Sequence, residues 1–247
     1  MAILHIRFLG EFNLVYGDRP VTTVNTARLQ SLLAYLVLHR DAPHPRYHLA
    51  FQFWPDSTES QAHTNLRKLF HQLRQALPDA DCFLCADTHT VQWRPDAPFT
   101  LDVAEFKNAV SQAAASKALC DAVALYRGDL LPSCYDDWIL PERERLQQTF
   151  VEATERLIAL LEDERDYRTA IGYAQRLLQH DPLHEAAHRH LMRLHALSGD
   201  RAAALRTYHV CATTLQRELG VEPGPATREV YERLLSLEPA TPLRPLT

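Results

Sequence analysis

Residues 53–77, FWPDSTESQAHTNLRKLFHQLRQAL, combine a turn, a helix cap and a long amphipathic helix. Trp54-Pro55-Asp56 interrupts the segment before it, and Ser57 or Thr58 is suited to cap the helix that follows. Apolar residues then recur at helical spacing and predict one buried stripe, made of Ala62, Leu66, Leu69, Phe70, Leu73 and Leu77. The stretch therefore predicts a surface helix that packs through one face only.

The opposite face of this helix carries amides, hydroxyls and basic groups. Its centre holds Gln61, Thr64, Lys68, His71 and Gln75, with Asn65 and Gln72 on one flank and Arg67 and Arg74 on the other. Amide and hydroxyl side chains read base edges, whereas Lys and Arg also hold phosphates. The face therefore favours a helix that enters the major groove of DNA. The competing interpretation is a merely solvated face, because amphipathic surface helices are common.

Composition limits the classes of protein that remain. The chain has 247 residues, of which 46% are hydrophobic and 23% charged, so two domains with real cores are expected. No apolar run approaches the ~20 residues that span a bilayer, and no membrane association is expected. Five cysteines without a regular framework favour a reducing cytoplasm. The net charge of -5 means that DNA contacts must come from local placement of basic residues.

The first part of the chain predicts a small antiparallel sheet, three helices and a hairpin, in that order. The expected elements are strands at residues 3–9, 12–16 and 21–24, helices at 27–39, 46–53 and 57–77, and strands at 82–86 and 90–94. Asp87-Thr88-His89 is the hairpin turn, and Pro95-Asp96-Ala97-Pro98 is interpreted as a stiff linker. This order is that of a winged helix with an added N-terminal sheet.

Residues 1–98 resemble the OmpR-type winged-helix DNA-binding domain in the form found in the Streptomyces antibiotic regulatory protein (SARP) family. The matching pieces are the strand pair ending in LGEF, ARLQSLLAYLVLHRDAP, the FWPD turn and NLRKLFHQLRQAL. The resemblance implies that the long helix enters the major groove and that the hairpin is the wing in the adjacent minor groove. By this resemblance, the residues that face the bases are Thr64, Lys68, His71, Gln72 and Gln75, with Asn65 beside them. The residues that contact phosphates are Arg67 and Arg74, and those of the wing are His89, Thr90 and Arg94.

Residues 99–237 predict an all-helical domain with an internal repeat. Helices are expected at 103–115, 117–126, 141–163, 167–180, 183–198, 201–219 and 225–236. Ala153, Leu157, Asp166 and Ala170 match Ala187, Leu191, Asp200 and Ala204 at a spacing of 34 residues. Paired helices of this period are the tetratricopeptide signature. The expected fold class is therefore mainly α with a small antiparallel β part.

This second part is similar to the bacterial transcriptional activator domain that follows the winged helix in the same family. The matching pieces are LDVAEF, LYRGDLLP, WILPERERL, HDPLHEAAHRHLMRLHALSGDRAAALRTY and ELGVEPGPATREVYERLL. The resemblance implies a transcriptional regulator that binds promoter repeats in double-stranded DNA as a homo-oligomer and contacts other proteins, RNA polymerase among them. The Pro-rich tail 238–247 is interpreted as a linker, after which family members often continue into a nucleotide-binding signalling domain.

Two short motifs suggest metal chemistry instead. His184-Glu185-Ala186-Ala187-His188 matches the HExxH zinc protease motif, and Cys82 and Cys85 form a CxxC. HEAAH lies inside a repeat helix, and the CxxC has no second pair; on a wing strand, one of its cysteines is expected in the core and the other at the edge. We expect no metal, no cofactor and no enzymatic activity. The alternative function is that of a protein-binding adaptor within a larger signalling protein, with a winged helix that no longer reads DNA.

Overall fold

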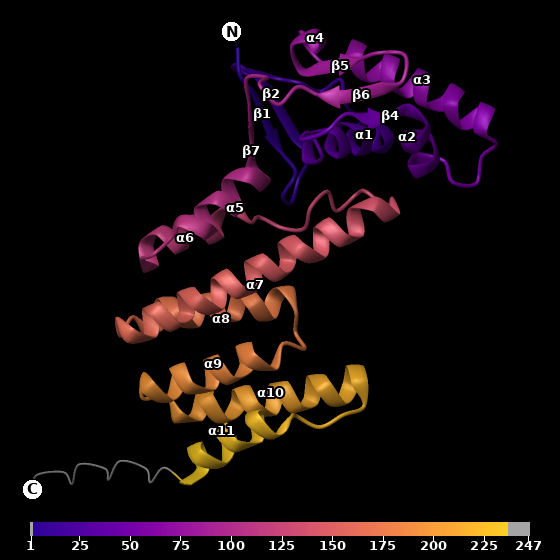
Figure 1. Ribbon diagram of the computed structural model, residues 1–247. Helices are drawn as coiled ribbons and strands as arrows, with labels where there is room; N and C mark the ends of the chain where they lie inside the picture. The colour runs from indigo at the N-terminus through magenta and orange to yellow at the C-terminus, as the bar shows by residue number, and fades with distance from the viewer. Residues whose placement is uncertain (1, 237–247) are drawn as a thin grey trace, which may run out of the picture. The chain divides into compact units, whose positions relative to one another are not determined.

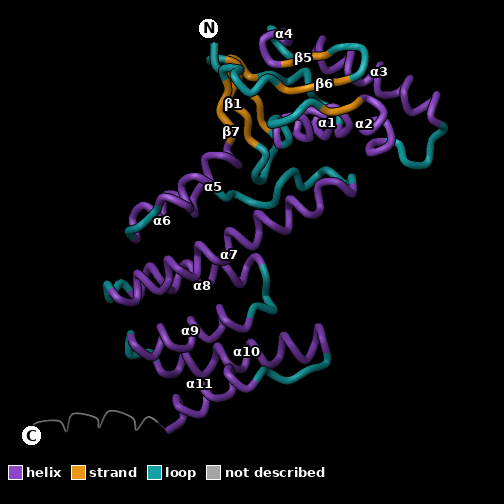
Figure 2. Tube along the Cα trace, viewed as in Figure 1, coloured by secondary structure: helices purple, strands orange, loops and turns teal. Residues whose placement is uncertain are grey.

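The computed structural model describes residues 2–236, which divide into two compact units. Of these residues, the first unit contains 2–112 and 121–149, and the second contains 113–120 and 150–236. All the strands belong to the first unit, and every named element after Leu101 is a helix (Figures 1 and 2). The protein is thus mainly helical with a small sheet part. The predicted division at residues 98 and 99 stays a prediction.

The first unit begins with a four-stranded sheet in the order β3-β2-β1-β7. Its strands are β1 (Leu4–Arg7), β2 (Asn13–Tyr16), β3 (Arg19–Pro20) and β7 (Phe99–Leu101). Leu4, Ile6 and Phe8 point into the core, because alternate residues of a strand share one face. The prediction of an antiparallel sheet was wrong in one respect, because β7 pairs with β1 in parallel.

Three helices follow in the first unit, α1 (Ala27–Leu38), α2 (Arg46–Phe53) and α3 (Glu59–Ala76), and α3 packs on both α1 and α2. A second sheet, in the order β4-β6-β5, is made of β4 (His44–Pro45), β5 (Leu84–Ala86) and β6 (Thr90–Trp93). Figure 1 shows the β5–β6 hairpin beside α3. The hairpin is anchored by Trp93, which is fully buried and stacks on Phe83 with 5.4 Å between ring centroids.

Several local predictions for this unit were wrong. The third strand lies at Arg19–Pro20 and not at residues 21–24, since the turn at Gly17 is tight and pairing resumes at once. Residues expected to start the hairpin strand form the short helix α4 (Ala80–Phe83) instead. The expected linker 95–98 is a turn whose Pro98 carbonyl accepts from Leu4 N at 3.0 Å and carries the chain directly into β7.

Residues 128–139 complete the first unit by packing against the sheet and α1. Gly10 and Gly128 both have positive φ and approach so closely that a Cβ on Gly128 would lie 3.1 Å from Gly10 Cα. The Trp138 indole donates to Ser31 Oγ at 3.1 Å, and Arg28 forms a 2.6 Å ion pair with Asp136. The first unit therefore includes chain that follows the predicted boundary at residue 98.

The second unit is helical: α8 packs on α9, α9 packs on α10, and α11 packs on both α9 and α10. The helices after β7 are α5 (Asp102–Gln112), α6 (Ser116–Leu125), η1 (Asp137–Ile139), α7 (Leu140–Asp163), α8 (Tyr167–His180), α9 (Glu185–Leu197), α10 (Arg201–Leu219) and α11 (Pro225–Ser236). Each predicted helix is present, with ends shifted by a few residues. The Pro-rich tail 238–247 lies outside the described residues.

Residues that match at the 34-residue spacing also have matching roles. Asp166 caps α8 by accepting from Thr169 N at 3.2 Å, and Asp200 caps α10 by accepting from Ala203 N at 2.8 Å. Ala170 and Ala204 are both fully buried one turn further on. The repeat in the sequence therefore corresponds to a repeat in local structure.

Within residues 2–236, no helix has the length and apolar character to cross a membrane. The five cysteines are free thiols. Cys134 and Cys211 are buried, and Cys120 is half-buried. The prediction for the CxxC was wrong: Cys82 lies on α4, half-buried, and Cys85 on β5, exposed, so neither is a core residue.

Candidate nucleic-acid interface

Helix α3 forms as its sequence predicts. Thr58 is the N-cap, and its hydroxyl accepts from Gln61 N at 3.4 Å, while Glu59 lies in the first turn, where its charge complements the helix dipole. The whole predicted stripe, from Ala62 to Leu77, is buried. Because one face is fixed in the core, the position of every outward side chain around the helix is fixed as well.

The polar side chains of α3 differ in whether they already have a partner within the protein. Thr64 donates to the Ser60 carbonyl oxygen at 2.9 Å, and Asn65 Oδ1 accepts from Gln61 Nε2 at 2.8 Å. Five exposed side chains form no hydrogen bond or ion pair with any residue in the described part of the chain: Arg67, Lys68, His71, Gln72 and Gln75. These five groups are available to an external ligand.

Two of the predicted site residues are placed differently. Arg74 forms a salt bridge with Asp81 of α4, so its charge is partly neutralised within the protein. Arg94 follows β6 at the end away from the hairpin turn, where its backbone N–H donates to the Phe83 carbonyl at 2.8 Å. His89 and Thr90 lie at the turn itself. The structure therefore brings His89 and Thr90 near α3 and leaves Arg94 at the other end of the strand.

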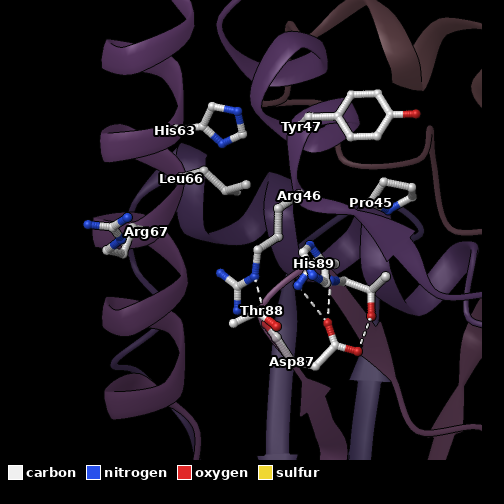
Figure 3. Close-up of a pocket in the computed structure, with 10 residues that line it drawn as sticks. Pro45, Arg46, Tyr47, His63, Leu66, Arg67, Asp87, Thr88 and His89 are labelled. Atoms are coloured by element: carbon white, nitrogen blue, oxygen red, sulfur yellow. Dashed lines mark hydrogen bonds between the residues drawn. The ribbon is translucent and has the colours of Figure 1, made fainter.

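A hollow of about 780 Å³ lies between α3, the start of α2 and the β5–β6 turn (Figure 3). It is lined by Pro45, Arg46, Tyr47, His63, Leu66, Arg67 and the turn residues Asp87, Thr88, His89 and Thr90. Two arginines and two histidines thus face it from three different elements. A concave surface of this composition is suited to an anion.

Arg46 lies at the centre of this hollow. Its Nε donates to the Asp87 carbonyl oxygen at 3.0 Å, and its guanidinium carbon lies 5.4 Å from the centre of the Phe70 ring. Partial burial lowers the pKa of Arg46, the Asp87 charge opposes that change, and the neighbouring Arg67 charge adds to it. Arginine stays protonated despite such shifts, so both residues present positive charge.

The turn that holds Arg46 is organised by the Asp87 carboxylate. It accepts from His89 N at 2.7 Å, Thr90 N at 2.6 Å and Thr90 Oγ1 at 2.9 Å. These hydrogen bonds keep the pKa of Asp87 below its usual range, because they favour the charged form. The Asp87 carboxylate therefore accepts hydrogen bonds within its own turn. The backbone carbonyl oxygen of the same residue holds the Arg46 side chain in place.

Sequence reasoning did not single out Arg46, Tyr47 or His63 as site residues. Arg46 follows Pro45 at the first position of α2, and Pro45 pairs with Thr90. A basic residue directly after a helix-starting proline was the available signal. It pointed to no ligand, since only the pairing of β4 with β6 brings this position to the hairpin turn.

The residues of the HEAAH motif have roles in the packing of the second unit. His184 Nδ1 accepts from Ala187 N at 3.2 Å as the N-cap of α9, and the buried His188 uses Nε2 to contact the Pro182 carbonyl oxygen at 3.1 Å. Glu185 accepts from Gly224 N at 2.9 Å. Within residues 2–236 there is no group of three or more His, Cys, Asp or Glu arranged for a metal ion.

Residues 101–235 match the protein family described as "Bacterial transcriptional activator domain". Over 91% of its length, the chain is 25% identical to the regulatory protein AfsR of Streptomyces coelicolor, and it covers 24% of that protein. It is 27% identical to the transcriptional regulatory protein EmbR of Mycobacterium tuberculosis, covering 96% of this chain and 64% of EmbR. The chain thus spans less than two thirds of these relatives.

The transcriptional regulatory protein MoaR1 of M. tuberculosis is 25% identical over 86% of this chain and 73% of its own length. A solved structure of M. tuberculosis EmbR, in complex with a low affinity phosphopeptide, has a TM-score of 0.75 and 26% identity. This likeness covers 97% of the present chain and 66% of the EmbR chain. These relatives are named as regulators and not as enzymes, in agreement with the expectation that the chain catalyses no reaction.

Proposed function

Because the chain belongs to the family of proteins with a bacterial transcriptional activator domain, we propose that it is a transcriptional regulator that binds promoter DNA through α3. In this proposal residues 1–98 are an OmpR-type winged helix with the β5–β6 hairpin as its wing. Residues 99–237 are a tetratricopeptide-like domain that contacts protein partners, RNA polymerase among them.

The observation that carries the proposal is the outward face of α3. A buried stripe orients the helix, and five exposed polar or basic side chains have no partner among the described residues. Lys68 lies near the middle of this face, one turn from Thr64 and nearly one turn from His71. Amide, hydroxyl and basic groups in this arrangement suit hydrogen bonds to base edges in the major groove.

One winged helix covers only a short site, so we propose that two or more copies occupy promoter repeats. Direct repeats follow from the resemblance to the SARP family. A footprint over the promoter of the protein's own gene should protect at least two half-sites. A single protected half-site with no repeat would contradict this part of the proposal.

The test of DNA reading compares the full chain with its Lys68→Ala variant on a promoter duplex and on a scrambled duplex of equal length. Loss of a base contact costs about 1–3 kcal/mol and relaxes specificity at that position, whereas loss of a phosphate contact weakens both duplexes alike. In either case the slope of log K against log salt should fall by about one unit. Lys117→Ala, which changes an exposed lysine on α6, is the matched control and should alter neither quantity.

The alternative is an adaptor that binds proteins and not DNA. It is favoured by the pairing of Arg74 with Asp81, which reduces the basic character of α3, and by the equal numbers of basic and acidic residues in positions 1–100. An adaptor would shift no duplex even at low salt, where phosphate contacts are strongest. Wild-type affinity and salt slope in Lys68→Ala would also favour it.

A further inference from the structure

We propose that the hollow between α3 and the β5–β6 turn holds one phosphate of the DNA backbone, clamped between Arg46 and Arg67. Sequence reasoning assigned no role to Arg46. The inference rests on the proposed function, because it assumes that α3 lies against DNA. The inference adds a contact that does not depend on the base sequence of the DNA. This contact comes from α2, outside the helix that is proposed to read the bases.

Arg46 is fixed in place before any ligand arrives. Its backbone N–H donates to the His89 carbonyl oxygen at 2.8 Å, its Nε donates to the Asp87 carbonyl oxygen at 3.0 Å, and its guanidinium lies over the Phe70 ring. Its two terminal nitrogens have no acceptor among the described residues. An arginine fixed through Nε loses little further freedom when its outer edge binds a phosphate, which favours affinity.

The charges around the hollow leave a net attraction for an anion. Arg67 and Arg46 both line it, and the Arg67 charge is one of the causes that lower the pKa of Arg46, after burial. The Asp87 carboxylate accepts three hydrogen bonds within its own turn. The Glu59 carboxylate lies beside a histidine, with 3.9 Å between Glu59 Oε1 and His63 Nε2. A phosphate between the two guanidinium groups would neutralise their repulsion and accept hydrogen bonds from both.

The place of Arg67 on α3 favours DNA as the source of that phosphate. At ~100° per residue, Arg67 lies roughly 60° around the helix from Thr64, on the flank of the face proposed to read bases. A duplex whose bases met Thr64 and Lys68 would therefore place a strand of its backbone along that flank. The hollow, which continues from Arg67 to the hairpin turn, lies where this strand would pass (Figure 3).

The experiment measures affinity of the full chain for promoter and scrambled duplexes over a salt series. Arg46→Ala should lower the affinity for both duplexes by the same factor, and it should make the salt slope shallower by about one unit. Arg46→Lys should retain most of the slope without regaining full affinity, because lysine lacks the planar fork that lets Nε bond the turn while the two terminal nitrogens bind a phosphate. Unchanged affinity and slope in Arg46→Ala, or a loss confined to the promoter duplex, would overturn the proposal.

Arg40→Ala is the matched control. Arg40 also donates to a carbonyl oxygen, that of Val37 at 3.0 Å, and also lies over an aromatic ring, that of Phe99 at 5.6 Å, but it does not line the hollow. It should bind both duplexes as the wild type does. If Arg46→Ala melts early, Arg67→Ala replaces it, because Arg67 is exposed and has no partner among the described residues, and the same loss is expected.

Inorganic phosphate, compared with chloride at matched ionic strength, separates a DNA phosphate from a free one. Displacement of the duplex by millimolar phosphate from the wild type but not from Arg46→Ala would show that phosphate and the duplex compete for the hollow, which supports the assignment. If phosphate binds the wild type through Arg46 but leaves its duplex affinity equal to that in chloride, the hollow is a site for a free anion and the assignment to the DNA backbone is wrong. A wild type that shifts no duplex at all refutes the proposed function, whereas a binding wild type with an indifferent Arg46→Ala refutes only this inference.

Discussion

Arg74 of α3 is paired with Asp81 of α4, although the sequence places Arg74 on the flank expected to contact phosphates. Both side chains are exposed, by 43% and 81% respectively, so the pair contributes little to stability. Its larger effect is electrostatic, because Asp81 brings negative charge to the surface that would face DNA. In the proposed complex with DNA, the pair would therefore weaken one phosphate contact without changing the fold.

Removal of that charge should strengthen DNA binding. In Asp81→Asn, Arg74 becomes free to contact a phosphate, and we expect affinity to rise several-fold and the salt slope to steepen by up to about one unit. Unfolding free energy should change by less than about 1 kcal/mol. Asp121→Asn removes the same charge from an exposed position on α6 and should leave binding unchanged. Equal gains in the two variants would show that net charge alone is responsible.

The cap of α10 should contribute measurably to the stability of the second unit. Asp200→Ala leaves Ala203 N without its acceptor and should lower the free energy of unfolding by about 1 kcal/mol. Asp200→Asn keeps a capping oxygen and should remain close to the wild type. Urea titration followed by circular dichroism measures the difference, and similar midpoints for alanine and asparagine would contradict the capping role.

His188 should make the protein less stable in mild acid. Burial lowers its pKa, outweighing the opposing effect of the Pro182 carbonyl. The unfolded chain therefore takes up a proton near the ordinary histidine pKa of about 6.5, and the folded protein only at lower pH. The stabilising contribution is complete above about pH 6.5 and is lost as pH falls through the lowered pKa.

Comparison of His188→Gln with the wild type isolates this contribution. Between about pH 7.5 and 5.5, the wild type should lose more unfolding free energy than the variant. His209→Gln, which changes an exposed histidine on α10, is the control and should follow the wild type. Parallel pH curves for His188→Gln and the wild type would contradict the prediction.

Purified protein should contain no stoichiometric zinc at HEAAH. The His184 Nδ1 and His188 Nε2 atoms already have backbone partners, and each would have to give one up or use its other nitrogen to bind a metal. Elemental analysis of the wild type and of the His184→Ala, His188→Ala double variant is the measurement. One equivalent of zinc that disappears in the double variant would refute this reading of the motif.

The sequence alone determined the longer helices and the exposed face of α3. The apolar spacing from Ala62 to Leu77 fixed the orientation of α3, and the 34-residue spacing matched Asp166 with Asp200, which the structure shows to be helix caps. Helices form from hydrogen bonds and side-chain periodicity within a few residues, so their signal lies within one stretch of chain. For this reason most of the outward face of α3 could be predicted.

Only the tertiary structure decided which distant segments meet. The three residues of β7 pair in parallel with β1, almost a hundred positions away, and the two residues of β4 bring Arg46 to the hairpin turn. Strands this short have no periodicity of their own, because their hydrogen bonds go to partners elsewhere in the chain. Arg74 and Asp81 are only seven positions apart, and their pairing depends instead on α4, which forms where the hairpin strand was expected to begin. The hollow beside Arg67 depends on the meeting of distant segments, and so the sequence could not predict it.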